Sequence, residues 1–365
     1  MTVIARMNVG GPAKLIHYLD HQLIESGIQH ILVTGYCESN EIDFLNTHQI
    51  RGQLYRLART KRSINLLSDF LSVYELSKII KKTKPNIIHT HTAKAGFIGR
   101  IAKLISGQKN IRIVHTFHGH LLYGYFGKIS SLIFNCTEKI LAKNTDVLIA
   151  VSNNVKNDLI TAGIGNTNKW RVIYPGIEIP VTFSNNRDSS SPLALLWIGR
   201  FSKVKNPMLA IKAYEKILPV IASKFTMVGG GELLNECLDY SRRHNLNIEF
   251  TGWDTDIYKY LEVSNLLLLT SFNEGLPLVV LEAASRCIPT LATNVGGVEE
   301  FIQDGETGFM SEVSLGSYSS KLISLVEKPE EIKKIGNNAF NKIEKGFNLE
   351  QFCNMHIELY RSLNN

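Results

Sequence analysis

The sequence predicts an α/β protein of two domains, each built on a doubly wound parallel sheet. Short apolar segments alternate with segments of helical periodicity along the whole chain, which is typical of βαβ units. The 365 residues are more than one hydrophobic core usually supports. A polar stretch, 179–192, divides the chain into halves that repeat the same plan, and we expect it to be the linker.

The N-terminal domain is predicted over 1–178 and the C-terminal domain over 193–345. Predicted strands of the first are Val3–Arg6, Ile31–Thr34, Ile87–His89, Ile113–Phe117 and Val147–Val151, and those of the second are Leu193–Trp197, Phe225–Val228, Ile248–Thr251, Leu266–Thr270 and Thr290–Ala292. Residues 346–365 form a predicted helix, expected to pack back toward the first domain. Ligands of such sheets bind beyond the carboxyl ends of the strands, so we expect the two domains to face each other across a ligand-binding cleft.

Composition is that of a globular protein, with 44% hydrophobic and 20% charged residues. No apolar run approaches the ~20 residues of a membrane span, and the first residues lack the features of a signal peptide. We therefore expect a cytoplasmic protein. The first strand begins so close to Met1 that a few leading residues could be missing.

Positive charge is concentrated in the first half. Residues 1–180 hold 22 Lys and Arg against 11 Asp and Glu, whereas the remaining residues hold 18 basic and 22 acidic side chains. Clusters of this kind, for example Lys81, Lys82 and Lys84, are commonly solvated faces, but such a one-sided surplus can also hold an anionic membrane surface. No nucleic-acid-binding motif is present, so nucleic acid is not an expected partner.

A candidate anion site follows the predicted strand Leu266–Thr270. A turn containing Glu274 and Gly275-Leu276 leads into a helix that we expect to begin at Pro277. The first N–H groups of that helix, near Leu278, lack intrahelical partners and lie at the positive end of the helix dipole, so they suit a phosphate. Glu282, roughly 7 Å further along the axis, could reach a sugar attached to that phosphate.

A solvated helix that happens to carry two acids is the alternative interpretation. It is disfavoured because the apolar neighbours of Glu282 predict a buried position, where a carboxylate requires a partner. The Glu-x7-Glu spacing of Glu274 and Glu282 resembles the signature of the GT4 group of retaining glycosyltransferases, which have the GT-B fold of two Rossmann-like domains. The resemblance implies that Glu282 holds the nucleotide ribose of the donor and that Glu274 lies beside the donor sugar.

The segment Gly199-Arg200-x4-Lys205 carries a second resemblance. Taken alone, Arg200 and Lys205 would more often be surface charges. Together with the glutamate pair they resemble the cations with which GT4 enzymes hold the donor diphosphate. The glycine turn Gly229-Gly230-Gly231 also resembles the family at this position, and we expect it to be structural.

Near the N-terminus, Gly10 and Gly11 follow the first strand and open a helix. Glycines allow close backbone approach and positive φ, so the pair could cup a phosphate or sugar of the donor, although a plain turn is also compatible with the pattern. The Gly-x-Gly-x-x-Gly fingerprint is absent, which counts against a nicotinamide enzyme.

Nine of the eleven histidines lie in the first half. Their spacings lack an accompanying carboxylate set, so a metal site is not expected. The segment around His118 resembles the GT4 segment whose histidine approaches the donor sugar, whereas His89 and His115 are expected to be core histidines. The aromatic loop 121–128 suits a sugar or lipid acceptor, or else folds onto the core.

The resemblance implies retaining transfer from a nucleotide-sugar donor, with UDP-sugars favoured, to a polyprenyl-diphosphate-linked glycan in bacterial surface polysaccharide synthesis, on the inner face of the plasma membrane. Fixed cations already oppose the charge of the departing diphosphate, so we expect neither a metal nor another cofactor. Two alternatives stay open: a nucleotide-sugar 2-epimerase of the same fold, and a non-catalytic nucleotide-sugar-binding module.

Overall fold

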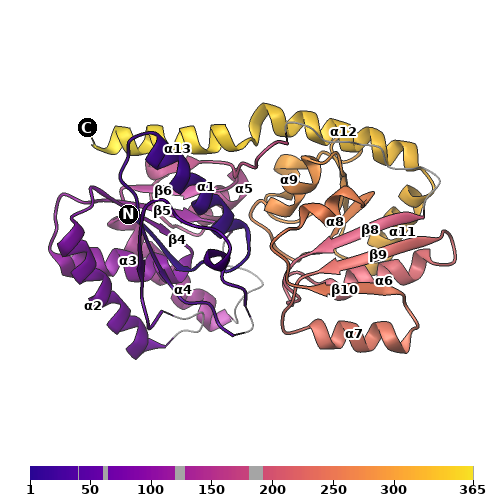
Figure 1. The fold of residues 1–365 in the computed structure, drawn as a ribbon, viewed down its shortest axis with the longest axis horizontal. Coiled ribbons are helices and arrows are strands. Elements are labelled where there is room, and N and C mark those ends of the chain that lie inside the picture. Colours follow the sequence, from indigo (N-terminus) through magenta and orange to yellow (C-terminus); the bar gives the residue numbers. More distant parts are fainter. Residues whose placement is uncertain (40, 61–64, 120–127, 181–191, 365) are drawn as a thin grey trace. The chain divides into compact units, whose positions relative to one another are not determined.

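The computed structural model describes residues 1–365 except 40, 61–64, 120–127, 181–191 and 365, so most of the predicted linker and of the aromatic loop lies outside the described residues. The chain forms two compact units. The first comprises Met1–Pro175 together with Glu350–Asn365, and the second comprises Gly176–Leu349. Each unit contains one parallel sheet (Figure 1).

The first unit is a seven-stranded sheet in the order β3-β2-β1-β4-β5-β6-β7, all pairs parallel. Its elements are β1 (Thr2–Arg6), α1 (Gly11–Glu25), β2 (Ile31–Gly35), η1 (Phe44–Asn46), β3 (Gln53–Arg56), α2 (Leu66–Thr83), β4 (Ile87–His91), α3 (Ala93–Ser106), β5 (Arg112–Phe117), α4 (Lys128–Lys143), β6 (Val147–Ala150), α5 (Asn153–Thr161), η2 (Thr167–Lys169), β7 (Trp170–Val172) and, at the end of the chain, α13 (Leu349–Asn364). The order reverses direction at β1, as in doubly wound nucleotide-binding folds.

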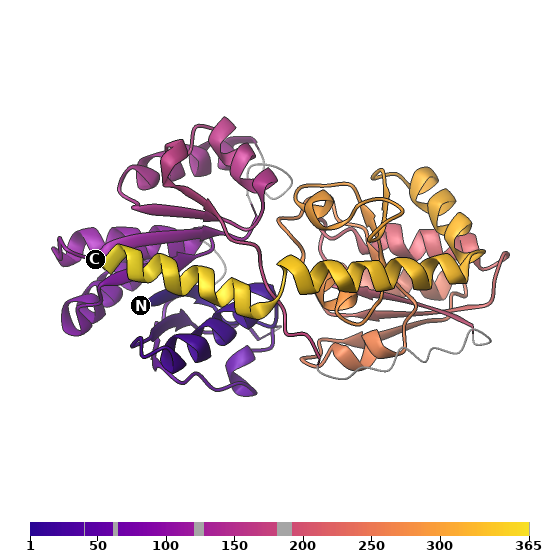
Figure 2. The same ribbon diagram turned by 90° about the horizontal axis from the view of Figure 1, so that it is seen from above.

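Helices cover both faces of this sheet. Figure 1 shows α1 and α13 on one face and α2, α3 and α4 on the other, and Figure 2 shows α13, in yellow, running across the first unit. A hydrogen bond of 2.5 Å between Tyr360 of α13 and His89 of β4 fixes the last helix to the sheet. The C-terminal segment is therefore part of the first unit.

The second unit is a six-stranded parallel sheet in the order β10-β9-β8-β11-β12-β13. Its elements are β8 (Leu193–Ile198), α6 (Pro207–Ile217), β9 (Ser223–Val228), α7 (Leu234–Arg243), β10 (Ile248–Gly252), α8 (Tyr258–Glu262), β11 (Leu266–Leu269), α9 (Leu278–Ala284), β12 (Thr290–Thr293), α10 (Val298–Phe301), β13 (Phe309–Ser311), α11 (Leu315–Val326) and α12 (Pro329–Gly346). The same reversal of strand order occurs at β8.

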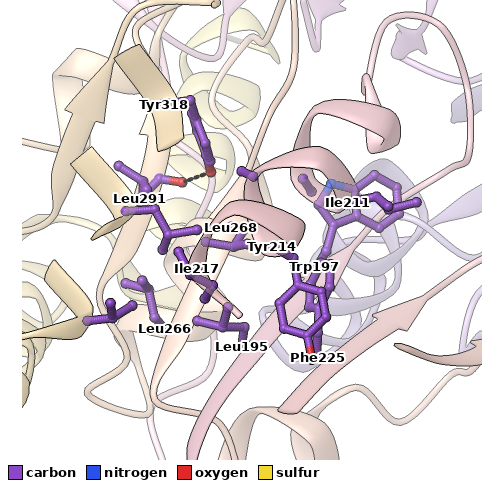
Figure 3. Close-up of a cluster of buried hydrophobic side chains, with 14 of the residues drawn as sticks. Leu195, Trp197, Ile211, Tyr214, Ile217, Phe225, Leu266, Leu268, Leu291 and Tyr318 are labelled. Atoms are coloured by element: carbon purple, nitrogen blue, oxygen red, sulfur yellow. Dashed lines mark hydrogen bonds between the residues drawn. The ribbon is translucent and has the colours of Figure 1, made fainter. Parts of the chain in front are cut away.

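The main core of the second unit lies between the sheet and helices α6 and α11. Its largest side chains include Trp197, Tyr214 and Phe225, all at most 2% exposed (Figure 3). The hydroxyl of Tyr318, on α11, donates to the Leu291 carbonyl at 2.8 Å, so the one polar atom of this buried ring has a partner. A smaller cluster packs α8 and α9 against the other face of the sheet.

All ten predicted strands are present, with ends within two residues of the expected positions. Three strands were not predicted: β3, β7 and β13. Each is a short edge strand of three or four residues. An edge strand needs apolar residues on fewer sides than a central one, so its sequence lacks the apolar run by which the others were recognised.

Candidate active site

The candidate site of the second unit lies at the reversal point of its sheet. Strands β8 and β11 are hydrogen-bonded neighbours. From β8 the chain continues to β9, toward one edge of the sheet, and from β11 it continues to β12, toward the other edge. The loop after β8 carries Arg200 and Lys205, and the loop after β11 carries Glu274. Reversal points of this kind are where doubly wound sheets bind ligands.

The two loops are joined by an ion pair. Lys205 Nζ lies 2.5 Å from Glu274 Oε1, with the lysine side chain 29% exposed and the carboxylate 8% exposed. The Ser271 hydroxyl donates to the same oxygen at 2.5 Å. These two donors hold the carboxylate in one orientation. Since a carboxylate offers about four lone-pair sites, it can accept further hydrogen bonds from a ligand hydroxyl.

Hydrogen bonds to the backbone fix the positions of both loops. The Thr270 hydroxyl shares its one hydrogen between the Lys205 and Asn206 carbonyls, at 3.1 and 2.9 Å, and it accepts from Trp197 Nε1 at 3.1 Å. On the other side, Thr293 Oγ1, at the end of β12, donates to the Ser271 carbonyl at 2.6 Å. The turn that carries Glu274 is thus anchored to both neighbouring strands of the sheet.

A glycine after β12 makes close packing against this turn possible. Gly296 has φ of 55°, and a Cβ there would lie 1.9 Å from the Glu274 carbonyl oxygen. Gly297 N–H donates to that same oxygen at 3.3 Å. A side chain at position 296 would therefore displace the backbone of Glu274.

The glycine turn 229–231 shapes the loop that carries Arg200. A Cβ at Gly229 would lie 1.9 Å from the Gly199 carbonyl oxygen, and a Cβ at Gly231 would lie 2.6 to 3.0 Å from the backbone of Phe201. The prediction that this turn is structural is confirmed. The Arg200 guanidinium lies 5.6 Å from the centre of the half-buried Trp253 ring, in the loop after β10.

Helix α9 begins one residue later than predicted. Pro277 is the N-cap, with ψ of 118°, and Leu278 is the first helical residue. The expectation that Pro277 opens the helix was therefore wrong, because its extended ψ lies outside the helical region. Gly275, Leu276 and Pro277 are buried, whereas Leu278 is half-buried.

Glu282 lies in the interior of α9 and is 4% exposed, as its apolar neighbours predicted. The next polar residue, Ser285, donates its hydroxyl to the Glu282 backbone carbonyl at 2.7 Å. A carboxylate this deeply buried can hold a polar ligand group firmly, because surrounding water does not compete.

In the first unit, Gly10 and Gly11 lie where the sequence predicted, between β1 and α1. Gly10 is the N-cap, but its φ of 166° is extended backbone, and a Cβ there would meet its nearest neighbour at 3.8 Å. Gly10 therefore does not use the left-handed conformation that glycine allows. The space beside Gly10 is open to a ligand.

His118 lies just after β5 and contacts other histidines. Its Nε2 is 2.9 Å from Nδ1 of His91. Burial lowers the pKa of His118 to about 4, and the nearby His356 acts in the same direction. A small cavity, lined by Leu15, Ile16, Leu19, His91, Thr116, His118, Ile149, Val151, Ile173, Phe352 and His356, lies between the sheet, α1 and α13. His118 is therefore a neutral ring at pH 7, able to give or accept a hydrogen bond.

His89 is the core histidine that the sequence predicted: its two ring nitrogens meet the Tyr360 hydroxyl and Thr116 Oγ1 at 2.5 and 2.7 Å. His115 is fully buried and its Nδ1 meets Thr90 Oγ1 at 2.8 Å, but its Nε2 has no hydrogen-bond partner. Across the described residues, no group of three His, Cys, Asp or Glu side chains is arranged to hold a metal ion.

Sequence reasoning missed two residues of the site. Ser271 looked like the end of a strand, and Trp253 lay in a loop without a recognisable motif. A signal for Ser271 existed in its spacing of three residues from Glu274, which suits a local side-chain contact. The position of Trp253 beside Arg200 depends on the pairing of β9 with β10 and β8, which no local pattern reveals.

Two Rossmann-like units in one chain, with a cation and a carboxylate paired at the reversal point of the second sheet, are the architecture of the GT-B fold. The family of the chain follows from comparison with known proteins. Residues 9–179 match the model "Glycosyltransferase Family 4" and residues 181–342 match "Glycosyl transferases group 1". The chain belongs to this GT4-type glycosyltransferase family, and it is a glycosyltransferase.

Its relatives include several bacterial enzymes. The chain is 30% identical over 317 residues to the UDP-Gal:α-D-GlcNAc-diphosphoundecaprenol α-1,3-galactosyltransferase of Escherichia coli, covering 82% of this chain and 81% of the relative. It is 28% identical over 309 residues to the N-acetyl-α-D-glucosaminyl L-malate synthase of Bacillus anthracis, covering 80% and 78%. Other relatives are named for capsular polysaccharide and O-antigen biosynthesis.

Among solved structures, sucrose-phosphate synthase from Thermosynechococcus elongatus superimposes with a TM-score of 0.85 at 20% identity, over 99% of this chain and 98% of that one. This similarity confirms the predicted fold of two doubly wound units.

Proposed function

We propose that this chain transfers a sugar, with retention of anomeric configuration, from a UDP-sugar to a glycan carried on a polyprenyl diphosphate, as a step of surface polysaccharide synthesis. The observation that carries the proposal is the Lys205–Glu274 pair at the sheet reversal point, in which Lys205 comes from the same loop as Arg200. The name of the E. coli relative, which covers four fifths of the chain, specifies both a UDP-linked donor and a lipid-diphosphate acceptor.

The donor diphosphate would lie against Arg200, Lys205 and the start of α9. When the bond between the anomeric carbon and the diphosphate oxygen breaks, negative charge grows on that oxygen, and these fixed positive groups oppose it. The acceptor hydroxyl forms the new bond from the same face of the sugar, and its proton passes to the departing diphosphate. This chemistry requires neither a metal ion nor a second carboxylate as base.

Glu274 would hold hydroxyls of the donor sugar, with its orientation set by Ser271 and Lys205. Glu282 would accept hydrogen bonds from the ribose, and the neutral ring of His118 would offer a hydrogen bond to the sugar. Gly10 and Gly11 would leave room for the sugar or phosphate at the start of α1.

A small, soluble acceptor is the second candidate. It is favoured by the relative from B. anthracis, which is named as a synthase of N-acetyl-α-D-glucosaminyl L-malate. The two candidates share the donor chemistry and differ only in the acceptor.

Nucleotide release over a panel of UDP-, GDP- and dTDP-sugars, each with a polyprenyl-diphosphate-linked sugar or with L-malate, separates these possibilities. We expect release only with a UDP-sugar and the lipid-linked acceptor, and NMR of the product should show the anomeric configuration of the donor. Conversion of the donor to its 2-epimer without any acceptor and without net release of nucleotide would replace the transferase proposal by the epimerase.

A further inference from the structure

The histidines at strands β4 and β5 divide between the two faces of the first sheet. Side chains two residues apart along a strand point to the same face, so His89 and His91 of β4 share one face. The Thr116 hydroxyl of β5 meets His89 on that face at 2.7 Å, and His118 follows Thr116 by two residues. Helices α1 and α13 cover this face (Figure 1). His118 thus lies beside His91 at the carboxyl ends of two neighbouring strands, where doubly wound sheets bind ligands.

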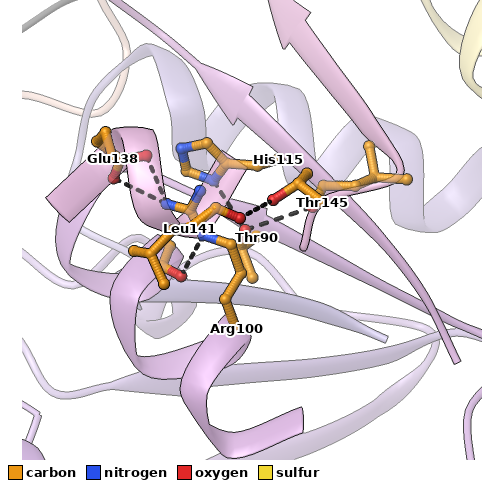
Figure 4. Close-up of polar contacts among 8 residues, drawn as sticks. Thr90, Arg100, His115, Glu138, Leu141 and Thr145 are labelled. Atoms are coloured by element: carbon orange, nitrogen blue, oxygen red, sulfur yellow. Dashed lines mark hydrogen bonds and ion pairs between the residues drawn. The ribbon is translucent and has the colours of Figure 1, made fainter. Parts of the chain in front are cut away.

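His115 lies on the opposite face and belongs to the core. Figure 4 shows its Nδ1 facing the Thr90 hydroxyl, at 2.8 Å. On the same face, both carboxylate oxygens of Glu138 accept from Nη2 of Arg100 at 2.8 Å. All four side chains are at most 2% exposed, so a ligand does not reach this network. The histidines of the other face are therefore the ones that can serve the site.

The rings of His91 and His118 are joined directly. Nδ1 of His91 lies 2.9 Å from Nε2 of His118, and the two rings are stacked, with centroids 5.1 Å apart and planes at 29° to each other. Burial holds the pKa of both rings below the ordinary 6.5 of histidine, so both are neutral at pH 7. A hydrogen bond between two neutral rings contains a single hydrogen. One ring must donate it and the other must accept it.

The surroundings of His91 indicate which ring donates. His91 is 3% exposed, and its Nε2 is buried without a hydrogen-bond partner among the described residues. If His118 donated, His91 would have to carry its own hydrogen on this Nε2, as a buried N–H without an acceptor. Orphaned N–H groups are rarer inside folded proteins than acceptors that lack a donor. The hydrogen therefore belongs on Nδ1 of His91, which donates it to Nε2 of His118.

His91 is itself held firmly. Its backbone pairs with Ile4 of β1 on one side and with Thr116 of β5 on the other. Its ring lies 4.1 Å from that of His89, measured between centroids, and His89 is in turn fixed by Thr116 and by Tyr360 of α13. A side chain on a central strand, supported by further contacts of this kind, orients its neighbour more precisely than a loop residue does.

We propose that His91 is a positioning residue of the transfer reaction: it donates its Nδ1 hydrogen to Nε2 of His118 and thereby fixes His118 in the tautomer that carries a hydrogen on Nδ1. This inference rests on the proposed function, in which His118 offers a hydrogen bond to the donor sugar. A neutral histidine whose Nε2 accepts can donate only from Nδ1. Among the described residues, the bond to His91 is the one hydrogen bond of the His118 ring, so its Nδ1 is left for the sugar.

Two amide variants test the donation from His91. Asparagine places its amide near the position of Nδ1, whereas glutamine places it near that of Nε2, so His91→Asn keeps a donor for His118 and His91→Gln does not. With the UDP-sugar that the donor panel identifies, kcat/KM should fall by about tenfold in His91→Gln and by less than about threefold in His91→Asn. The affinity for UDP alone, which lacks the sugar, should match wild type in both variants.

Two further variants separate positioning from a merely structural role. In a His118→Ala background, His91→Gln should change kcat/KM by less than about twofold, because the group through which His91 acts is gone. His356→Gln is the matched control. It alters another buried histidine that lines the same cavity, and it should change turnover by less than about twofold. Thermal unfolding of each variant shows whether it is folded.

Nitrogen NMR of isotope-labelled histidines measures the tautomer without any substrate, and the resonances of His118 are those that His118→Ala removes. We expect a hydrogen on Nδ1 of His118 in wild type and in His91→Asn, and loss of this preference in His91→Gln. A hydrogen on Nε2 of His118 in wild type would overturn the proposal. So would equal losses of kcat/KM in the two amide variants, or multiplicative losses in the double variant. Absence of transfer with every donor would contradict the proposed function instead, and the spectra would still decide whether His91 sets the tautomer.

Discussion

Lys205 Nζ and Glu274 Oε1 lie 2.5 Å apart although 69 residues separate them in the chain. Lys205 follows β8 and Glu274 follows β11. These strands are adjacent because the connection from β10 to β11 passes back over β9 and β8, so that β11 pairs with the other edge of β8. The cation predicted to bind phosphate and the acid predicted to lie beside the sugar therefore form one ion pair.

The pair should behave as a unit in mutagenesis. Lys205→Met and Glu274→Gln should each lower kcat/KM by about tenfold or more, and the double variant should lose less than the product of the two, because either change alone removes the same contact. Nucleotide-release kinetics on the four proteins measures this. Strictly multiplicative losses would show that the two side chains act independently.

Arg200→Ala and Glu282→Ala should each abolish most turnover and weaken donor binding while leaving the fold intact. The expected loss is more than about tenfold, or ~1.4 kcal/mol of transition-state stabilisation. Lys203→Ala and Glu262→Ala, which remove exposed charges from the same unit, are matched controls. Donor affinity is measured by calorimetric titration and turnover by nucleotide release. Losses of less than tenfold in both quantities for both test variants would contradict the assignment of this site.

Turnover should survive EDTA. Arg200, Lys205 and the start of α9 already oppose the charge of the diphosphate, so chelation of divalent ions should change the rate less than twofold. Complete loss of nucleotide release, restored by Mg²⁺ or Mn²⁺, would show that a metal ion performs that task.

Reversing Lys81, Lys82 and Lys84 to Glu should weaken binding to anionic vesicles, and added salt should weaken wild-type binding too, because exposed charges are screened beyond ~8 Å at physiological ionic strength. Donor affinity should not change, since the candidate phosphate-binding cations lie in the second unit. Salt-independent binding by wild type would argue against an electrostatic contribution.

Among the described residues, no helix is long and apolar enough to cross a bilayer.

Stability should fall as the solution is acidified below pH 6.5. Burial lowers the pKa of His356, which is 2% exposed, from its usual 6.5 to about 4. Between these values the unfolded chain binds a proton that the folded chain does not, so stability rises with pH across this window, by on the order of 3 kcal/mol from this group. Thermal unfolding of His356→Gln should show a shallower dependence on pH from 6.5 to 4. An unchanged slope would assign the effect to other buried histidines.

Local sequence patterns predicted most of the strands, because central parallel strands are apolar on both faces and are therefore recognised as apolar runs. The strand before Glu274 and the burial of Glu282 are examples. Positions set by a single turn were less certain: Pro277 proved to be a cap, and Gly10 proved to be extended.

The sequence by itself determined the two doubly wound sheets, the family and the residue types of the candidate site. Only the tertiary structure decided which of them meet: Lys205 with Glu274, Ser271 with the same carboxylate, and Arg200 with Trp253. It also decided that Arg100 and Glu138 pair inside while Leu132 and Ile133 remain outside. The physical reason is that helical periodicity shows which residues share a side of a helix, but the choice of the buried side depends on partners from distant segments.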